Sequence, residues 1–150
     1  MSAITIADKV GIGVEQSSPY GPIVRQTFQG PIAAGENVLA VKIPTGCIPN
    51  AVALIVRKPS TGTCTVKVGN IKGFNGTEVF TAGTYEATGK TLSAAVDTVY
   101  AFPAQPSATG LVVAGNAEYV TFTPNNAIPD GTEFDIKLFA SYTLRYPIEE

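Results

Sequence analysis

The sequence predicts an all-β protein, and three observations lead to that prediction. Apolar and polar side chains alternate between residues 133 and 146, as they do in a strand with one buried and one solvated face. Fifteen Gly and eleven Pro interrupt the chain at short intervals, which is typical of short strands joined by turns. No segment shows the apolar period of an amphipathic helix. A β-sandwich or barrel of about eight to ten strands is therefore expected.

The chain divides into an N-terminal arm and a single domain. Residues 1–21 alternate only weakly, at Ile4, Ile6 and Val10, before a polar stretch, so we expect an extended arm outside the central core. Residues 22–150 are expected to form one β-sandwich domain. Its expected strands are 22–29, 36–43, 50–58, 63–69, 97–102, 110–114, 117–123 and 134–146, with Asp130-Gly131 as a tight turn before the last.

Residues 70–95 differ from the rest of that domain. They contain four Gly, many Thr and only scattered apolar residues. A long polar insertion of this kind is typical of surface connections. We therefore expect residues 70–95 to form a projecting loop or hairpin.

The composition favours a component of an assembly over a free-standing protein. Only 15% of the residues are charged, whereas 45% are hydrophobic. Because interface cores are depleted in Lys, Glu and Asp, a surface poor in charge favours burial against partners, including other copies of the chain. The ten basic residues are scattered and the net charge is −2, which argues against nucleic-acid binding. No apolar run approaches membrane-spanning length, and the N-terminus does not resemble a secretion signal, so synthesis in a cytoplasm is expected.

The sequence offers no recognisable catalytic or cofactor chemistry. It contains no His, which removes the commonest general base and the commonest metal ligand. No Asp falls within a calcium-loop pattern. We expect no enzyme activity, no metal and no cofactor. The glutamates that could form a hydrolytic pair lie beside turns or strand ends, where solvated carboxylates are usual; they are Glu36, Glu78, Glu86, Glu118 and Glu133.

The two cysteines are expected to be free thiols. If residues 51–58 and 63–69 form a hairpin around residues 59–62, Cys64 lies near Arg57 and away from Cys47. Cys64 then serves as a small core residue. Four aromatic residues that could form a sugar-binding platform are better explained by core packing and strand-pair contacts; they are Tyr85, Tyr100, Phe102 and Tyr119.

Phe139 is the exception in the final strand, because it lies on the otherwise polar face with Lys137 and Ser141. Two interpretations remain open. One is a β-bulge or a bend in a strand that is longer than usual. The other is an apolar contact with a neighbouring subunit.

Two blocks of sequence resemble a known group of proteins. Residues 37–69 read NVLAVKIPTGCIPNAVALIVRKPSTGTCTVKVG, with an Ile-Pro-x-Gly strand end, a branched apolar strand and a strand that closes on Val-Gly. Residues 110–146 pair a Tyr-Val-Thr-Phe-Thr strand with an Asp-Gly turn and the long final strand. This layout resembles the small β-sandwich virion proteins of tailed bacteriophages, namely head decoration (cement) proteins and head-fibre proteins.

The resemblance implies a jelly-roll-like sandwich, often a homotrimer, that binds the major capsid protein on the outside of the capsid and stabilises it. The implied location is the capsid surface of the virion. Within the arm, Ile4, Ile6 and Val10 are the expected contact residues, and Phe139 is the expected contact in the domain. The alternative function is a carbohydrate- or receptor-binding module of a phage fibre or tail, acting through residues 70–95 and sensitive to Phe80 or Tyr85.

Overall fold

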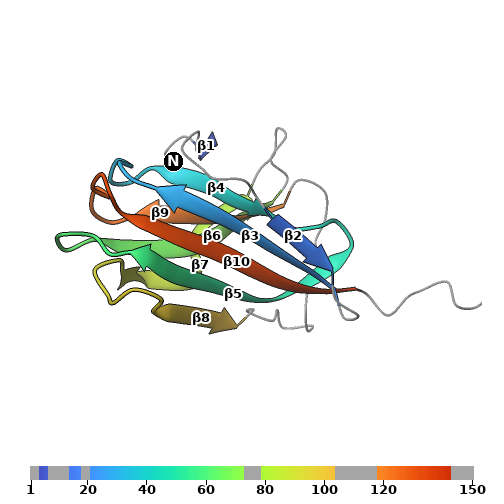
Figure 1. Ribbon diagram of the computed structural model, residues 1–150. Helices are drawn as coiled ribbons and strands as arrows, with labels where there is room; N and C mark the ends of the chain where they lie inside the picture. Colours follow the sequence, from blue (N-terminus) through green and yellow to red (C-terminus); the bar gives the residue numbers. More distant parts are fainter. Residues whose placement is uncertain (1–3, 7–13, 18–20, 73–78, 104–117, 143–150) are drawn as a thin grey trace, which may run out of the picture.

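The computed structural model describes residues 4–6, 14–17, 21–72, 79–103 and 118–142, and these residues form an all-β sandwich (Figure 1). Ten strands occur within those ranges. They are β1 (Ile4–Ile6), β2 (Val14–Ser17), β3 (Pro22–Gln29), β4 (Asn37–Lys42), β5 (Cys47–Lys58), β6 (Thr65–Lys72), β7 (Val79–Thr91), β8 (Val99–Pro103), β9 (Tyr119–Pro124) and β10 (Glu133–Tyr142).

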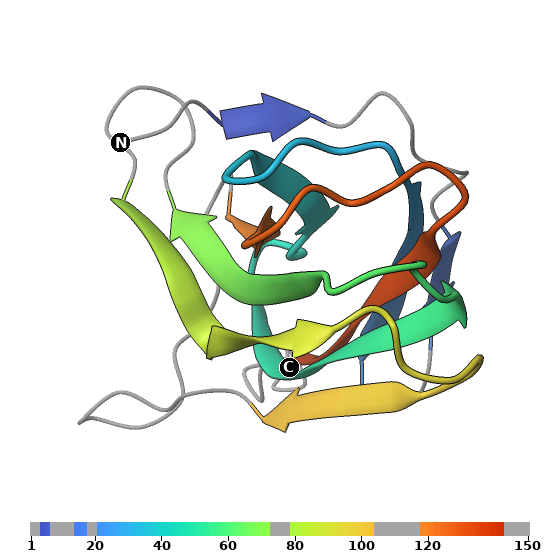
Figure 2. The same ribbon diagram turned by 90° about the vertical axis from the view of Figure 1, so that its left-hand side faces the viewer.

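The strands form two sheets that face each other across one core (Figure 2). Sheet A has the order β1-β4-β9-β6-β7, and sheet B has the order β2-β3-β10-β5-β8. Without β1 and β2, each sheet has four antiparallel strands, and the orders β4-β9-β6-β7 and β3-β10-β5-β8 are those of a jelly roll. The predicted jelly-roll-like antiparallel sandwich is confirmed.

The chain crosses between the sheets at nearly every connection from β3 onward. Among the strands from β3 onward, only β6 and β7 are both consecutive and paired within one sheet; before them, β2 pairs with β3 in sheet B. The expected hairpin of residues 51–58 with 63–69 is therefore wrong, because β5 belongs to sheet B and β6 to sheet A. Residues 59–62 connect the two layers instead. A Pro-Ser-Thr-Gly sequence is compatible with either kind of connection, since it specifies a change of direction and not the strand that follows.

Alternation along β10 places the even-numbered side chains in the core. Phe134, Ile136 and Leu138 are fully buried, and Ala140 is nearly so. At the centre of the core, the rings of Phe28, Phe122 and Phe134 pack with centroids 4.8 to 5.7 Å apart. These rings come from both sheets and join the two layers. Residues 143–146 of the expected final strand and the expected strand 110–114 lie outside the described residues.

The remaining sequence features are located as follows. Residues 65–72 and 79–91 of the region around the expected projecting loop lie in the paired strands β6 and β7, and residues 73–78 lie outside the described residues. Cys47 and Cys64 are both buried and no disulfide joins them, so Cys64 is a core residue as predicted. The predicted tight turn before β10 is confirmed, because Asp130 and Gly131 form a turn in which Gly131 has φ +89°. No helix within the described ranges is long and apolar enough to cross a membrane.

Candidate functional site

The outer face of sheet B carries the most distinctive group of polar side chains in the described residues. At its centre is Asp135 in β10, whose side chain is only 1% exposed. Thr27 Oγ1 donates a hydrogen bond to Asp135 Oδ1 over 2.7 Å, and Arg57 Nε donates to Oδ2 over 2.9 Å. Arg25 Nη1 lies 3.5 Å from the same Oδ2. Three strands, β3, β5 and β10, thus supply partners to one buried carboxylate.

Arg57 reaches Asp135 through an irregularity in strand β5. Glu133 pairs with Lys58 and Phe134 pairs with Val56, so Arg57 is the extra residue of a β-bulge. Arg57 Nη1 also lies 3.0 Å from Asp97 Oδ1. Asp97 has φ +68°, a left-handed conformation that Asp adopts more readily than most residues. The hydrogen bond that the Arg57 guanidinium donates to Asp135 is the main cause that raises the pKa of Arg57.

The alternating pattern places Asp135 on the polar face of the final strand, where a solvated side chain is expected. That expectation is wrong, because the side chain is buried. Its side chain does project from the outer face, as the odd-numbered positions of β10 should. Long side chains from β3 and β5 cover it there, because arginine can lay its methylene stem over a neighbour while its charged end stays in water. The side chains of Arg25 and Arg57 are still 39% and 37% exposed. The arginines therefore cover Asp135 without themselves leaving water.

Phe139 also lies on this outer face, toward the other end of β10. It pairs with Ile23 on β3 and with Ala51 on β5, and its side chain is partly buried. The Lys137 ammonium lies 5.1 Å from the centre of its ring, within the range of a cation–π contact. A second bulge follows directly, because the register with β5 shifts between Phe139 and Ala140. Subunit contact by Phe139 remains a prediction.

The expected contact residues of the arm are only partly described. Ile4 and Ile6 belong to β1, which pairs in parallel with β4 at the edge of sheet A, with Ile4 opposite Asn37 and Ile6 opposite Leu39. Val10 lies outside the described residues. The structure does not bring Ile4 and Ile6 together with Phe139, because β1 is at an edge of sheet A and Phe139 is in the middle of sheet B.

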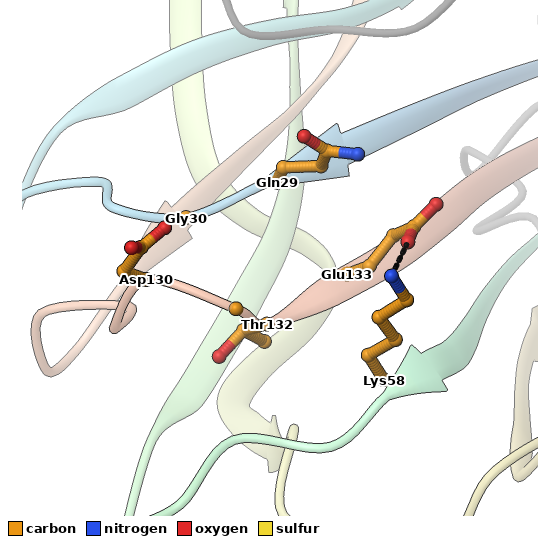
Figure 3. A pocket seen from close by; sticks show the side chains of 7 residues that line it. Gln29, Gly30, Lys58, Asp130, Thr132 and Glu133 are labelled. Atoms are coloured by element: carbon orange, nitrogen blue, oxygen red, sulfur yellow. Dashed lines mark ion pairs between the residues drawn. The ribbon is translucent and has the colours of Figure 1, made fainter.

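A shallow polar pocket of about 120 Å³ lies at one end of sheet B, where β3 and β5 end and β10 begins (Figure 3). Its side chains include Gln29, Lys58, Asp130 and Glu133, and the Lys58 ammonium is 3.6 Å from the Glu133 carboxylate. Both ends of this ion pair are in contact with water, so it contributes little stability. Among the residues that the structure describes, no three Asp, Glu or Cys side chains gather in a way that could hold a metal ion.

Glu118 belongs to a second group of polar residues, which is buried beside sheet A. Glu118 was expected to be a solvated surface carboxylate, but its side chain is almost completely buried just before β9. Asn70 Nδ2 donates to Glu118 Oε2 over 3.4 Å, and Thr84 Oγ1 donates to Asn70 Oδ1 over 2.7 Å. Burial, assisted by the Glu118 charge, raises the pKa of Tyr85 to about 12. The burial of Glu118 could not be predicted from its position beside a turn, because β6 and β7 come close to it only in the folded sheet.

The aromatic side chains considered for sugar binding lie mostly against the core. Phe102 is buried, and Tyr85 and Tyr100 are partly buried and pack on the core residues. The Tyr100 hydroxyl donates to the carbonyl oxygen of Thr91 over 3.1 Å. The interpretation as packing residues is confirmed for Tyr85, Tyr100 and Phe102, and it stays a prediction for Tyr119.

Comparison of the whole fold with solved structures shows what class of protein the chain is similar to. A chain in the capsid of Ralstonia phage GP4 matches with a TM-score of 0.56 and 15% identity, covering 95% of this chain and 92% of that one. A chain in the capsid asymmetric unit of cyanophage Pam1 matches with a TM-score of 0.55 and 14% identity, covering 95% and 93%. The chain therefore has the fold of proteins found in phage capsids, and the resemblance to phage virion proteins is confirmed at the level of fold.

No protein-family model matches the sequence, and no curated protein is similar to it in sequence. The similarity thus lies in the arrangement of strands and not in a motif. The Arg25–Asp135–Arg57 group was likewise missed by inspection of the sequence. One signal for it was available, since Asp is depleted in strands and Asp135 stands in the middle of the strongest strand pattern of the chain.

Proposed function

We propose that this chain is a non-enzymatic structural protein of a tailed-phage head, which binds the major capsid protein on the outside of the capsid and stabilises the shell. The observation that carries this proposal is the match of nearly the whole chain to nearly the whole of two chains from phage capsid structures.

The chemistry of the described residues supports a structural role. The two buried carboxylates are engaged with neighbouring polar side chains: Asp135 with two arginines and Thr27, and Glu118 with Asn70. Such groups hold strands in register. The pocket at the end of sheet B is shallow and its charged groups form an exposed ion pair. Binding through surface area is thus the mechanism best suited to this molecule.

The proposed stabilisation works through repetition. Each copy buries a modest area against the shell, and the same contact recurs at every symmetry-related position. Many weak contacts that must open together resist internal pressure far better than one contact does. We further propose that the protein binds as a homotrimer, in which the three copies engage neighbouring capsid subunits at once.

The test is the copy number of this chain in purified particles, measured by quantitative mass spectrometry against the major shell protein. A decoration role predicts hundreds of copies per particle at a fixed ratio to the shell subunit. Release of the chain by mild treatment should leave an intact shell that ruptures at a lower temperature, and adding the chain back should restore the original value. A few copies per particle, or absence from particles, would contradict the proposal.

A further inference from the structure

The strand register arranges the outer face of sheet B into rows that run across four strands. Across these four strands the first row is apolar and consists of Ile23, Phe139, Ala51 and Pro103; on the edge strand β2 it continues at Gln16, opposite Ile23. All four residues are at least partly exposed. An apolar row across four strands of a solvent-facing sheet is unusual, because the residues on such a face are normally polar.

The second row combines small apolar residues with two adjacent cations. It consists of Arg25, Lys137, Ala53 and Ala101. Arg25 and Lys137 are directly opposite each other on neighbouring strands, an arrangement that is unfavourable by itself. We call these two rows together the docking face, and Figure 1 shows its four strands, β3, β10, β5 and β8, side by side in front of sheet A.

The charges on this face do not balance among the described residues. Asp135 lies beside the docking face but is shared by Arg25 and Arg57, with the shorter contact to Arg57. Lys137 is within ion-pair distance of no carboxylate in the described part of the chain, and its ammonium contacts the ring of Phe139. The docking face therefore holds an excess of positive charge next to an apolar row, although the whole chain is net negative.

We infer that the docking face binds a different protein whose surface presents apolar side chains and a carboxylate that fits between Arg25 and Lys137. This inference rests on the proposed function, in which that protein is the major capsid protein. A carboxylate placed there relieves the repulsion between the two cations, and the neighbouring apolar row provides area that excludes water from the ion pair. Charge complementarity of this kind selects a partner and speeds its encounter.

A second copy of this chain is a poor occupant of the same face. In a two-fold contact each partner uses the same surface patch, so Arg25 and Lys137 of one copy would lie close to the same cations of the other. The repulsion would then double instead of being relieved. The charge pattern therefore disfavours a two-fold contact between copies through this face; the head-to-tail contact of a trimer, which would place a different surface against it, is an outcome that the test distinguishes.

The size of the face predicts a weak, salt-sensitive single contact. Four strands at about 4.8 Å spacing and two rows about 6.8 Å apart give roughly 260 Å². Stable pairs bury about 800 Å² on each partner. Salt screens partly exposed charges, so occupancy should fall as ionic strength rises from about 0.05 to 0.5 M.

The test measures binding of purified full-length protein to shells from which it has been released. Lys137→Glu would place a carboxylate opposite Arg25 and remove the excess positive charge, and we expect at least a tenfold loss of affinity. Lys137→Arg should bind within about twofold of the wild type. The matched control is Lys67→Glu, a partly buried lysine on strand β6 of the opposite sheet, which should also bind within twofold. Circular dichroism and the urea midpoint establish that every variant is folded.

A second readout identifies the partner group directly. A zero-length carbodiimide cross-linker joins Lys137 to a carboxylate only where the two are in contact, and mass spectrometry of treated particles should recover Lys137 joined to an Asp or Glu of the shell protein. Equal binding of Lys137→Glu and Lys67→Glu, or a cross-link only to another copy of this chain, would overturn the inference and leave the proposed function intact. Failure of the wild type to bind shells would overturn both.

Discussion

Asp135 shows how a single side chain can organise the outer surface of a sheet. The carboxylate is buried on the face that normally meets water, and it accepts hydrogen bonds from Thr27 and Arg57 while Arg25 lies nearby. Hydrogen bonds to a charged group are about twice as strong as those between neutral groups. Because its partners come from β3 and β5, on either side of β10, Asp135 joins the three central strands of sheet B through side chains as well as backbone.

Replacement of Asp135 should therefore destabilise the fold measurably. Asp135→Asn removes the charge and leaves two arginines facing each other, and we expect the free energy of unfolding to fall by about 1–3 kcal/mol. The loss is smaller than for a fully buried pair because both arginines can rehydrate. Urea denaturation measures it. The control is Asp130→Asn, at an exposed carboxylate, which should change stability by less than about 0.5 kcal/mol. Equal effects of the two substitutions would show that the Asp135 contacts contribute nothing.

Tyr85 makes the stability of the protein depend on pH in the alkaline range. Its pKa is raised to about 12 in the folded state, first by burial and then by the Glu118 charge. Between about pH 10 and pH 12 the unfolded chain loses the phenolic proton while the folded chain keeps it. Ionisation then favours the unfolded state, so stability falls as the pH rises through this range, by at most about 2–3 kcal/mol.

The measurement is the urea midpoint of the wild type and of Tyr85→Phe at pH 9 and at pH 11.5. The difference between the two proteins should shift in favour of Tyr85→Phe at the higher pH, because phenylalanine has no proton to lose. If both proteins lose the same stability between these pH values, other groups account for the alkaline sensitivity.

At the scale of elements, the turn before β10 sets the start of the most central strand of sheet B. Gly131 has φ +89°, which a side chain at Cβ disfavours, although the space around the residue is open. By contrast, Gly21 has an ordinary backbone but approaches β10 so closely that a Cβ would lie 2.1 Å from the Ala140 carbonyl oxygen. One glycine is therefore required by conformation and the other by packing.

Gly131→Ala should cost about 1–2 kcal/mol through the left-handed backbone alone. Gly62→Ala is the matched control, because that position is equally open and its φ is not in the left-handed range; we expect it to be neutral or slightly stabilising. Thermal unfolding of both variants separates conformational strain from any general effect of adding a methyl group. A neutral Gly131→Ala would mean that the turn can change its type without loss.

At the scale of the whole molecule, the jelly roll leaves β1 and β2 as additions to a complete sandwich. β1 adds to sheet A beside β4, and β2 adds to sheet B beside β3. The three core rings that pack on one another, Phe28, Phe122 and Phe134, come from β3, β9 and β10, so the sandwich has its central packing without these two strands. This architecture is compatible with an N-terminal segment that serves assembly more than folding.

A variant that lacks residues 1–20 tests that role. We expect it to fold, with a stability loss of no more than about 2 kcal/mol from the two edge strands, and to occupy shells less than the full chain does at equal concentration. Circular dichroism measures folding and stability, and sedimentation with shells measures the occupancy. Undiminished occupancy by the shortened protein would remove residues 1–20, including Ile4, Ile6 and Val10, from the proposed contact.

The fold class and most strand positions of this protein follow from the order of its residues. The alternation through β10, the Asp130-Gly131 turn and the burial of Cys64 could be predicted because each depends on local side-chain periodicity or turn geometry. The pairing of the strands, the separation of β5 and β6 into different sheets, and the burial of Asp135 and Glu118 became visible in the folded molecule alone. The rows of the docking face were equally inaccessible, since Arg25 and Lys137 are far apart in the chain and become neighbours only through the register of β3 with β10. Periodicity records which face a residue takes, but strand pairing over long sequence separations decides what lies next to it.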